Sequence, residues 1–158
     1  MRSTGSRRVR MSPSGPDRVA IPLAELGPGS ALPVEAFGTT LALFNVAGRL
    51  WALENRCLHH GGPLCRGRVG GAQLPSEPGR YRYDADRPVV TCPWHGWEYE
   101  LETGRALFNR RVRVRTFEVR EEGDEIAVYN RVPTRAGPQS SSAISAAARA
   151  APSVSTGR

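Results

Sequence analysis

All cysteines and histidines of this 158-residue chain lie in two short stretches. The first, residues 57–65, reads C-L-H-H-G-G-P-L-C, and the second, residues 92–97, reads C-P-W-H-G-W. A C-x-H pattern in the first and a C-x-x-H pattern in the second supply two thiolates and two imidazoles, which make a complete four-ligand set. The candidate metal ligands are Cys57, His59, Cys92 and His95.

Short β-strands separated by turns lead into both stretches. Residues 41–46 and 49–53 read as a hairpin with Gly48 in its tight turn, and the second strand runs directly towards Cys57. A short β run at 89–91 leads into Cys92. Further strands are predicted at 97–100, 105–108, 112–115, 117–119 and 126–129, with turns at 101–104 and 123–124. Because no stretch shows helical periodicity over three turns, we predict an all-β fold, a small antiparallel sandwich or barrel.

Two kinds of metal centre use two cysteines and two histidines. One is a structural Zn²⁺ site, and the other is a [2Fe–2S] cluster in which two histidines replace two cysteines on one iron. Gly61, Gly62 and Gly96 let backbone N–H groups approach bridging sulfides and tolerate unusual dihedral angles. Trp94 and Trp97 add apolar bulk that keeps water from a hydrolysable cluster. A zinc site needs neither feature, so these surroundings favour the cluster.

The two stretches resemble the ligand boxes of Rieske [2Fe–2S] proteins, specifically the oxygenase and ferredoxin branch, whose second box reads C-P-x-H-G-W. The similarity extends from Val46 to Val128 in the order hairpin, box, strand, box and closing strands. It implies a Rieske-type domain of small antiparallel sheets that holds one [2Fe–2S] cluster between two loops at one end. The residues implied around the cluster are Gly61, Gly62, Trp94, Gly96, Trp97 and Tyr99.

The chain departs from the high-potential Rieske proteins of respiratory complexes. Those proteins carry an extra disulfide, and its two positions are Gly62 and Trp94 here. They also have a hydrogen-bonding serine where this chain has Trp97. Fewer donors to the sulfurs stabilise the reduced cluster less, so we expect a reduction potential towards the low end of the range of about −150 to +300 mV.

The spacer between the boxes is long for the family. Thirty-two residues separate His59 from Cys92, and the excess, about residues 70–87, contains two prolines and several glycines. We expect a surface insertion near the cluster, either inert or involved in partner recognition.

Other polar residues near the boxes have simpler interpretations. His60 is expected to face solvent and to point away from His59, and Cys65 to be a small packed residue. Alternating Glu98, Glu100 and Glu102 are expected on one solvent-facing side of a strand. Two sets of arginines are expected either on solvated surfaces or in a docking patch: Arg56, Arg66 and Arg68, and Arg110, Arg111, Arg113 and Arg115.

The basic pI of about 10.3 comes from the ends of the chain. Residues 1–16 and 131–158 each carry four arginines and no acid, whereas residues 17–130 carry 14 arginines against 15 acidic residues. The central part is therefore close to neutral, and we expect no specific nucleic-acid binding. We predict a disordered basic N-terminal tail at 1–16, a Rieske domain at 17–131 and a disordered Ala/Ser/Pro-rich tail at 132–158.

The sequence predicts a cytoplasmic protein without a membrane span. It has no run of about 18 apolar residues. Arg7 and Arg8 are followed by a polar, turn-forming stretch rather than by the apolar segment of an export signal. Three cysteines without a secretion signal indicate a reducing compartment, where clustered Cys and His bind metal.

The chain keeps too little chemistry to be its own catalyst, so no catalytic residue is predicted. A Rieske oxygenase needs a second iron held by two histidines and a carboxylate, but only His60 remains here. We therefore predict a one-electron, ferredoxin-like carrier that takes an electron from a reductase and delivers it to an oxygenase or related redox enzyme. The alternatives are a small subunit or accessory module of a larger oxidoreductase, as in assimilatory nitrite reductase, and a zinc-stabilised binding module.

Overall fold

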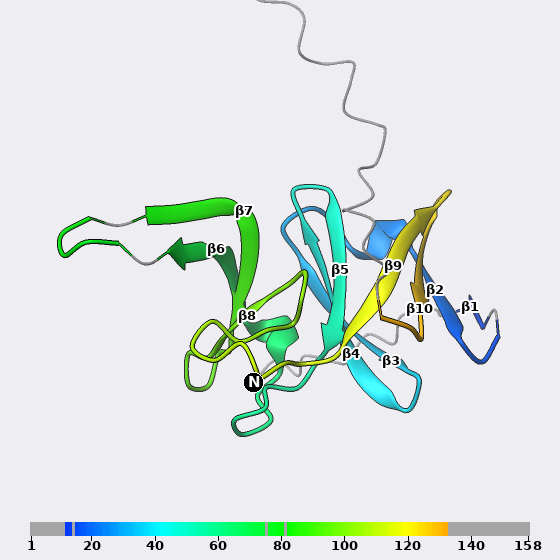
Figure 1. The fold of residues 1–158 in the computed structure, drawn as a ribbon. Coiled ribbons are helices and arrows are strands. Elements are labelled where there is room, and N and C mark those ends of the chain that lie inside the picture. The colour runs from blue at the N-terminus through cyan, green and yellow to red at the C-terminus, as the bar shows by residue number, and fades with distance from the viewer. Residues whose placement is uncertain (1–11, 14, 75, 81, 133–158) are drawn as a thin grey trace, which may run out of the picture.

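Two antiparallel sheets make up the fold in a computed structural model that describes residues 12–13, 15–74, 76–80 and 82–132 (Figure 1). The larger sheet has the strand order β1-β2-β10-β9-β5-β4-β3, and the smaller has the order β6-β7-β8. The strands are β1 Ser12–Pro13, β2 Arg18–Pro22, β3 Ala31–Ala36, β4 Thr39–Val46, β5 Arg49–Glu54, β6 Arg68–Leu74, β7 Arg82–Thr91, β8 Glu98–Glu100, β9 Thr116–Glu122 and β10 Glu125–Tyr129. Short 3-10 helices lie at η1 Leu23–Glu25 and η2 Leu64–Arg66. The predicted all-β fold of small antiparallel sheets is confirmed.

Strand β4 forms a wall between two hydrophobic cores. Leu41 and Leu43 face a core that the larger sheet builds with residues from β2, β3, β9 and β10. Ala42 and Phe44 face a second core on the side of the metal loops. Because successive side chains of a strand point to opposite faces, burial of both faces requires the unbroken apolar run from 41 to 44.

The predicted hairpin at 41–53 is present as β4 and β5. Its two turn residues, Ala47 and Gly48, both have positive φ, +53° and +81°, as a two-residue type I′ turn requires. The ladder pairs Val46 with Arg49 and continues to the pairing of Leu41 with Glu54. This pairing fixes where β5 ends and therefore where the first metal loop begins.

The segments predicted as strands at 105–108 and 112–115 are loop instead. Only two isolated bridges form there, between Tyr99 and Ala106 and between Arg105 and Arg113. The chain turns back too soon for a ladder, because Val114 N–H donates to the carbonyl of Gly104 at 3.0 Å. At Gly104 an added Cβ would lie 2.3 Å from the Val114 carbonyl oxygen, so this close crossing needs glycine. Strands β9 and β10 confirm the predictions at 117–119 and 126–129.

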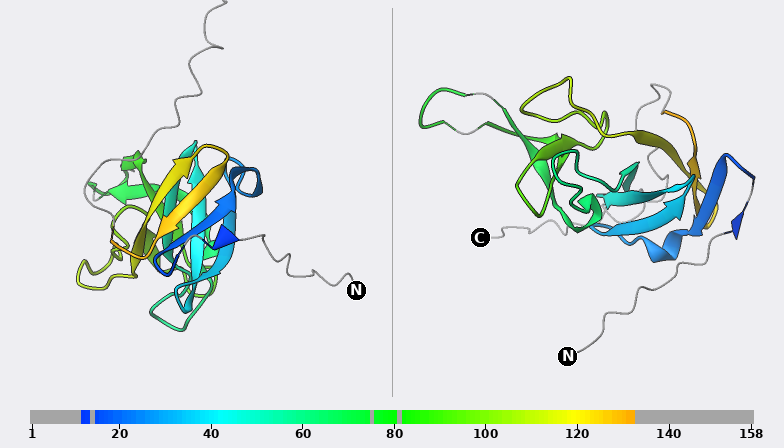
Figure 2. Two further views of the ribbon diagram at one scale, coloured as in Figure 1. Left: turned by 90° about the vertical axis from the view of Figure 1, so that its right-hand side faces the viewer. Right: turned by 90° about the horizontal axis from the view of Figure 1, so that it is seen from below.

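The insertion expected at 70–87 forms the outer part of the β6–β7 hairpin. Its ladder runs from Arg68 opposite Thr91 to Leu74 opposite Arg82, with a register shift between Gly71 and Ala72. The hairpin projects away from the larger sheet in Figure 1 and in the right-hand view of Figure 2. It is therefore an ordered β arm on the surface of the protein, and β7 carries the chain from this arm directly into Cys92.

The described residues cover only part of the predicted tails. Ser12 and Pro13 lie within the segment 1–16 and pair with Ala20 and Val19 of β2. Residues 1–11 and 133–158, which contain the rest of both predicted tails, lie outside the described residues. Among the described residues, no helix has the length and apolar character needed to cross a membrane.

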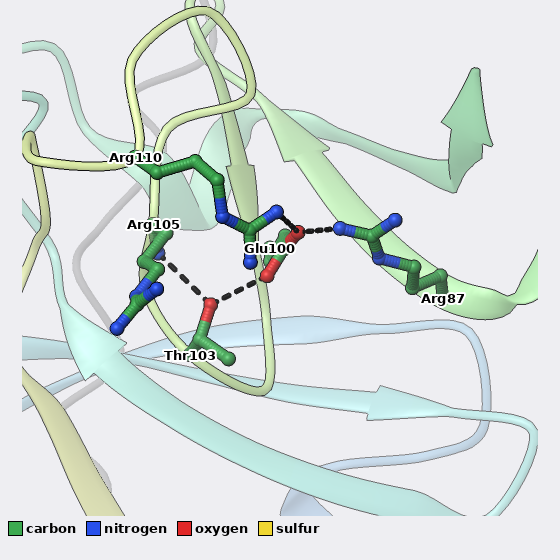
Figure 3. Close-up of polar contacts among 5 residues, drawn as sticks. All are labelled: Arg87, Glu100, Thr103, Arg105 and Arg110. Carbon is green, nitrogen blue, oxygen red and sulfur yellow. Dashed lines mark hydrogen bonds and ion pairs between the residues drawn. The ribbon is translucent and has the colours of Figure 1, made fainter. Parts of the chain in front are cut away.

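A buried carboxylate joins the smaller sheet to the loop that follows it (Figure 3). Glu100 in β8, whose side chain is 6% exposed, accepts a hydrogen bond from Arg87 of β7. Thr103 donates to the same carboxylate at 2.6 Å, and Arg110 Nη1 lies 3.6 Å from it. The expectation that Glu98, Glu100 and Glu102 share a solvent-facing side is therefore wrong for Glu100, because arginines from two neighbouring segments cover it.

Opposing effects act on the pKa of Glu100. Burial alone raises the pKa, but hydrogen bonds from Thr103 and Arg87 and the charges of Arg87 and Arg110 outweigh it, so the pKa lies below its ordinary value. A carboxyl group of this kind stabilises the fold above its unfolded-state pKa. That contribution is lost as the pH falls through the lower pKa of the folded state.

Replacing Glu100 by Gln is expected to destabilise the protein by about 1–3 kcal/mol at pH 7, because it leaves Arg87 without its charged acceptor. The difference from wild type should shrink as the pH falls below the ordinary carboxyl value of 4.5. Urea midpoints followed by circular dichroism between pH 7 and pH 3 measure both effects. The exposed Glu102→Gln is the control, and equal losses in the two variants would contradict this role.

Candidate metal centre

The two metal loops share one backbone construction. In the first, Cys57 N–H donates to the Gly62 carbonyl at 2.9 Å and Gly61 N–H donates to the Cys57 carbonyl at 2.8 Å. In the second, Cys92 N–H donates to the Trp97 carbonyl at 2.7 Å and Gly96 N–H to the Cys92 carbonyl at 3.1 Å. Each loop thus closes on its own cysteine within five residues.

Glycine is needed four residues after each cysteine. Gly61 has φ +79° and Gly96 has φ +75°, a left-handed conformation that disfavours side chains with a Cβ. The predicted importance of these two glycines therefore has a conformational cause. Gly96 has open space around its Cβ position, so its requirement is backbone freedom rather than close packing.

The loops place the sulfur atoms inside and the imidazoles outside. Cys57 and Cys92 are 1% and 2% exposed, and their thiols are in hydrogen-bonding contact. His59 and His95 are exposed, and their ring centroids lie 4.6 Å apart. The two thiols therefore lie on the core side of the loops, and the two imidazoles lie close to each other on the solvent side.

Each sulfur lies among hydrogen-bond donors. The Tyr99 hydroxyl lies 3.3 Å from Cys57 Sγ and accepts the Leu58 N–H at 3.2 Å. The backbone N–H groups of Trp94 and His95 bind the Cys92 thiol. A cysteine thiolate carries no proton, so Tyr99 must be the donor when Cys57 is ionised. Burying a thiolate requires such donors, and here they come from Tyr99 of β8 and from the backbone of the second loop.

Burial and mutual contact shift the pKa values in this centre. Burial is the main cause that raises the pKa of Cys92, and the N–H groups of Trp94 and His95 partly oppose it. Burial likewise raises the pKa of the Tyr99 hydroxyl well above its ordinary range, with a further contribution from its hydrogen bond to Cys57. Partial desolvation, followed by the positive charges of His60 and His95, lowers the pKa of His59.

Gly62 marks the point where the two loops meet. A Cβ added at Gly62 would lie 2.7 Å from Cys92 Sγ and 3.1 Å from the Trp94 ring. No side chain fits there, so the absence of a Cβ lets the first loop close onto the sulfur of the second. Trp94 covers this contact with one part of its ring while the side chain stays 57% exposed.

An aromatic stack leads from the imidazoles to the surface. The Trp97 ring stacks on His59 with centroids 4.6 Å apart and an interplanar angle of 13°. Phe108 packs edge-on against Trp97 at 4.4 Å and is itself 57% exposed. The prediction that Trp97 shields the centre is consistent with this stack. Phe108 is not among the predicted site residues, because a strand is predicted for the segment 105–108 that forms a loop here.

The two remaining Cys and His residues, His60 and Cys65, differ in their surroundings. His60 is exposed, as expected, but it does not point away, because its ring centroid lies 4.0 Å from that of His59. Cys65 is half-buried, packs against the loop-side core and receives no disulfide partner. Its backbone N–H donates to Asn55 Oδ1 at 2.8 Å. Cys65 is thus a packed residue, as predicted.

The donor set fits a cluster with two iron atoms. A Rieske [2Fe–2S] cluster spreads its ligands over two irons, with two cysteines on one and two histidines on the other. Two adjoining buried thiols beneath two adjoining exposed imidazoles have the order that such a cluster needs.

Three comparisons with known proteins agree with this geometry. Residues 18–118 match the family described as Rieske [2Fe-2S] domain. Over 110 residues the chain is 30% identical to the 3-phenylpropionate/cinnamic acid dioxygenase ferredoxin subunit of Escherichia coli (strain K12), covering 69% of this chain and 89% of that relative.

Solved structures share the fold. A putative NADH-dependent nitrite reductase small subunit from Mycobacterium tuberculosis superposes with a TM-score of 0.57 at 26% identity, covering 74% of this chain and 98% of that one. The ferredoxin of carbazole 1,9a-dioxygenase from Nocardioides aromaticivorans IC177 has a TM-score of 0.56 at 21% identity, covering 71% and 95%. The chain belongs to the Rieske [2Fe-2S] domain family, whose cofactor is a [2Fe–2S] cluster.

Proposed function

We propose that this protein is a Rieske-type ferredoxin, a one-electron carrier between a reductase and an oxygenase or related redox enzyme. The observation that carries this proposal is the layered site, with two thiols buried in the core and two imidazoles at the surface. The relative from E. coli, a dioxygenase ferredoxin subunit, has nearly its whole length matched by this chain. The donor is therefore proposed to be a reductase and the acceptor an oxygenase.

We propose that the ligands are Cys57 and Cys92 through Sγ and His59 and His95 through ring nitrogens. The two loops contribute one cysteine and one histidine each, so both must close before the set is complete. The two imidazoles lie side by side, the Cys57 thiol contributes to raising the pKa of Cys92, and the two cysteines bear no disulfide. His60 is excluded from the set on the C-x-H spacing of the Rieske box, although its ring adjoins that of His59.

When bound, the [2Fe–2S] cluster supplies reversible one-electron chemistry. The chain's own residues determine how the site is used. Tyr99 donates to the Cys57 sulfur, and the N–H groups of Trp94 and His95 donate to the Cys92 sulfur, which stabilises negative charge there. The core around both cysteines excludes water, and the exposed imidazoles provide the shortest route to a partner.

The chain has too few remaining groups for a second reactive centre. It contains three histidines, and two of them belong to the proposed ligand set. An oxygenase iron site would need two more histidines with a carboxylate. We therefore propose that the centre that uses the electron lies outside these 158 residues.

A second function within the family is a small subunit of a larger oxidoreductase. The M. tuberculosis nitrite reductase small subunit is 26% identical and is covered over 98% of its length. A stable complex with a large reductase subunit would favour this alternative over a freely exchanging ferredoxin. Both alternatives use the same cluster and ligands. We propose a cytoplasmic location for either one, supported by three free cysteines.

Replacing His59 or His95 by Ala is expected to abolish the red-brown colour and the Rieske-type EPR signal of the reduced protein, because each removes one of four ligands. His60→Ala is the matched control, since it removes a neighbouring imidazole and should retain both signals and two irons per chain. Cys65→Ala should also retain them. Bleaching by His60→Ala with a coloured His59→Ala would show that the ligand assignment is wrong, and a colourless wild type containing one zinc would exclude the cluster.

Replacing Gly62 by Ala is expected to lower the iron content of the purified protein several-fold, because the new Cβ would meet Cys92 Sγ at 2.7 Å. Gly27→Ala is the control, since its Cβ position is open and its φ is not in the left-handed region. Iron and acid-labile sulfide analysis measures the effect. Full iron occupancy in Gly62→Ala would contradict the close contact of the two loops.

A further inference from the structure

Within residues 17–131, arginines and acidic residues are unevenly distributed between the end that holds the metal centre and the rest of the fold. The inter-strand segments 55–67, 92–97 and 101–115 form the end that holds the metal centre, and together they contain seven arginines and one acidic residue, Glu102. The rest of residues 17–131 contains eight arginines and 14 acidic residues. The central part is nearly neutral as a whole, yet its cluster-binding end is strongly positive.

The seven arginines of this end differ in the contacts that their side chains make. Arg110 lies near Glu100, and Arg115 donates to Asn130 and stands over the Phe117 ring, away from the metal loops. The other five make no ion pair with any carboxylate in the described part of the chain. We call them, together with Arg110, the arginine rim: Arg56, Arg66, Arg105, Arg110, Arg111 and Arg113.

Apart from the ion pair of Arg110 with Glu100, carboxylates of the described residues do not account for the rim. Arg105 and Arg113 face each other across an isolated antiparallel bridge, and like charges in directly opposite positions are destabilising. Elsewhere in the fold, by contrast, Arg18, Arg120 and Arg131 each have a carboxylate partner within 2.7 Å. A charge arrangement that costs stability and lies beside a functional site indicates a role in binding.

Parts of the rim lie beside the exposed part of the metal centre. The loop carrying Arg110 and Arg111 also carries Phe108, which contacts Trp97 and through it His59. On the other side, Arg56 Nε lies 3.7 Å from the Cβ position of Gly61 in the first loop. The positive groups therefore belong to the same face as the imidazoles.

Apolar side chains occupy the same face. Leu58, Trp94 and Phe108 are exposed by 51%, 57% and 57%, although each lies next to a buried part of the centre. Apolar and aromatic contacts within a charged rim are the pattern of protein–protein interfaces, where the rim charges steer the encounter.

We propose that this face docks a protein whose redox centre is surrounded by carboxylates, with Leu58, Trp94 and Phe108 in the contact and the arginine rim around it. This proposal rests on the proposed electron-carrier function and adds that the docking surface of the partner carries negative charge. Neutralising the rim requires a ring of Asp and Glu on the partner. A nucleic acid also carries negative charge, but it offers no centre that exchanges an electron with the cluster.

The rim can be tested with small redox probes of opposite charge. Reduced full-length protein is mixed in a stopped-flow instrument with hexacyanoferrate(III) or with tris(phenanthroline)cobalt(III), each of which takes one electron from the protein. At about 10 mM ionic strength the Debye length is about 30 Å, so the rim acts on probes approaching the whole face. The double variant Arg111→Glu/Arg113→Glu should react about tenfold more slowly with the anion and faster with the cation.

The controls separate the rim from net charge and from misfolding. Arg149→Glu/Arg158→Glu changes the net charge by the same amount outside the described residues and should stay within about twofold of wild type. Arg113→Glu places an acidic group opposite Arg105, which favours the bridge. Iodide and caesium quenching of the exposed Trp94 gives a second readout that does not depend on electron transfer, and the rim variant should lower iodide quenching and raise caesium quenching.

Each outcome decides one proposal. If the reduced protein shows no Rieske EPR signal, the electron-carrier function fails. If the signal is present but both double variants react alike with the anion, the rim proposal is overturned while the carrier function stands. A labelled single-stranded oligonucleotide that binds wild type and loses binding in the rim variant would assign the arginines to nucleic acid and also overturn the proposal.

Discussion

The proposed ligand set requires two negatively charged sulfur atoms to be buried together, and the rest of this end of the fold depends on this constraint. A buried thiolate is stable only with hydrogen-bond donors around it. These donors are the Tyr99 hydroxyl and the backbone N–H groups of Trp94 and His95, and each loop is closed by hydrogen bonds at its own cysteine. Gly62 then allows the loops to touch, and Tyr99 reaches across from β8. Imidazoles are left at the surface, which gives the site an inner layer of buried sulfurs and an outer layer of exposed imidazoles.

The β4–β5 hairpin links this end to the remainder of the fold. Phe44 of β4 and Trp51 of β5 pack in the same core as Cys57 and Cys92, while alternate residues of both strands fill the core of the larger sheet. The first loop therefore starts from a strand that is fixed on both faces. The second loop starts from β7, and Glu100 holds β7 against the loop at 101–113 through Arg87 and Arg110. The first loop is therefore held in place by the packing of β5, and the second by the hydrogen bonds and ion pairs that hold β7.

Much of this could be predicted from sequence because the signals were local. The ligand boxes, the β4–β5 hairpin with its Gly48 turn, and β10 follow from spacing, alternation and turn residues. The loop at 105–115 could not, since its course depends on the approach of Gly104 to Val114. Burial of Glu100 and the contact of His60 with His59 were also missed, because both depend on neighbours distant in the chain or on loop closure. The alternation of side chains along a strand, taken alone, predicts that Glu100 faces solvent.

The central claim is that one chain holds two irons in unequal ligand environments. Mössbauer spectroscopy of protein enriched in ⁵⁷Fe measures these environments directly. The account predicts two iron signals of equal area, one typical of sulfur ligands alone and one with nitrogen ligands, with the added electron of the reduced protein on a single iron. A single all-sulfur environment, or a protein that binds no iron, would contradict it.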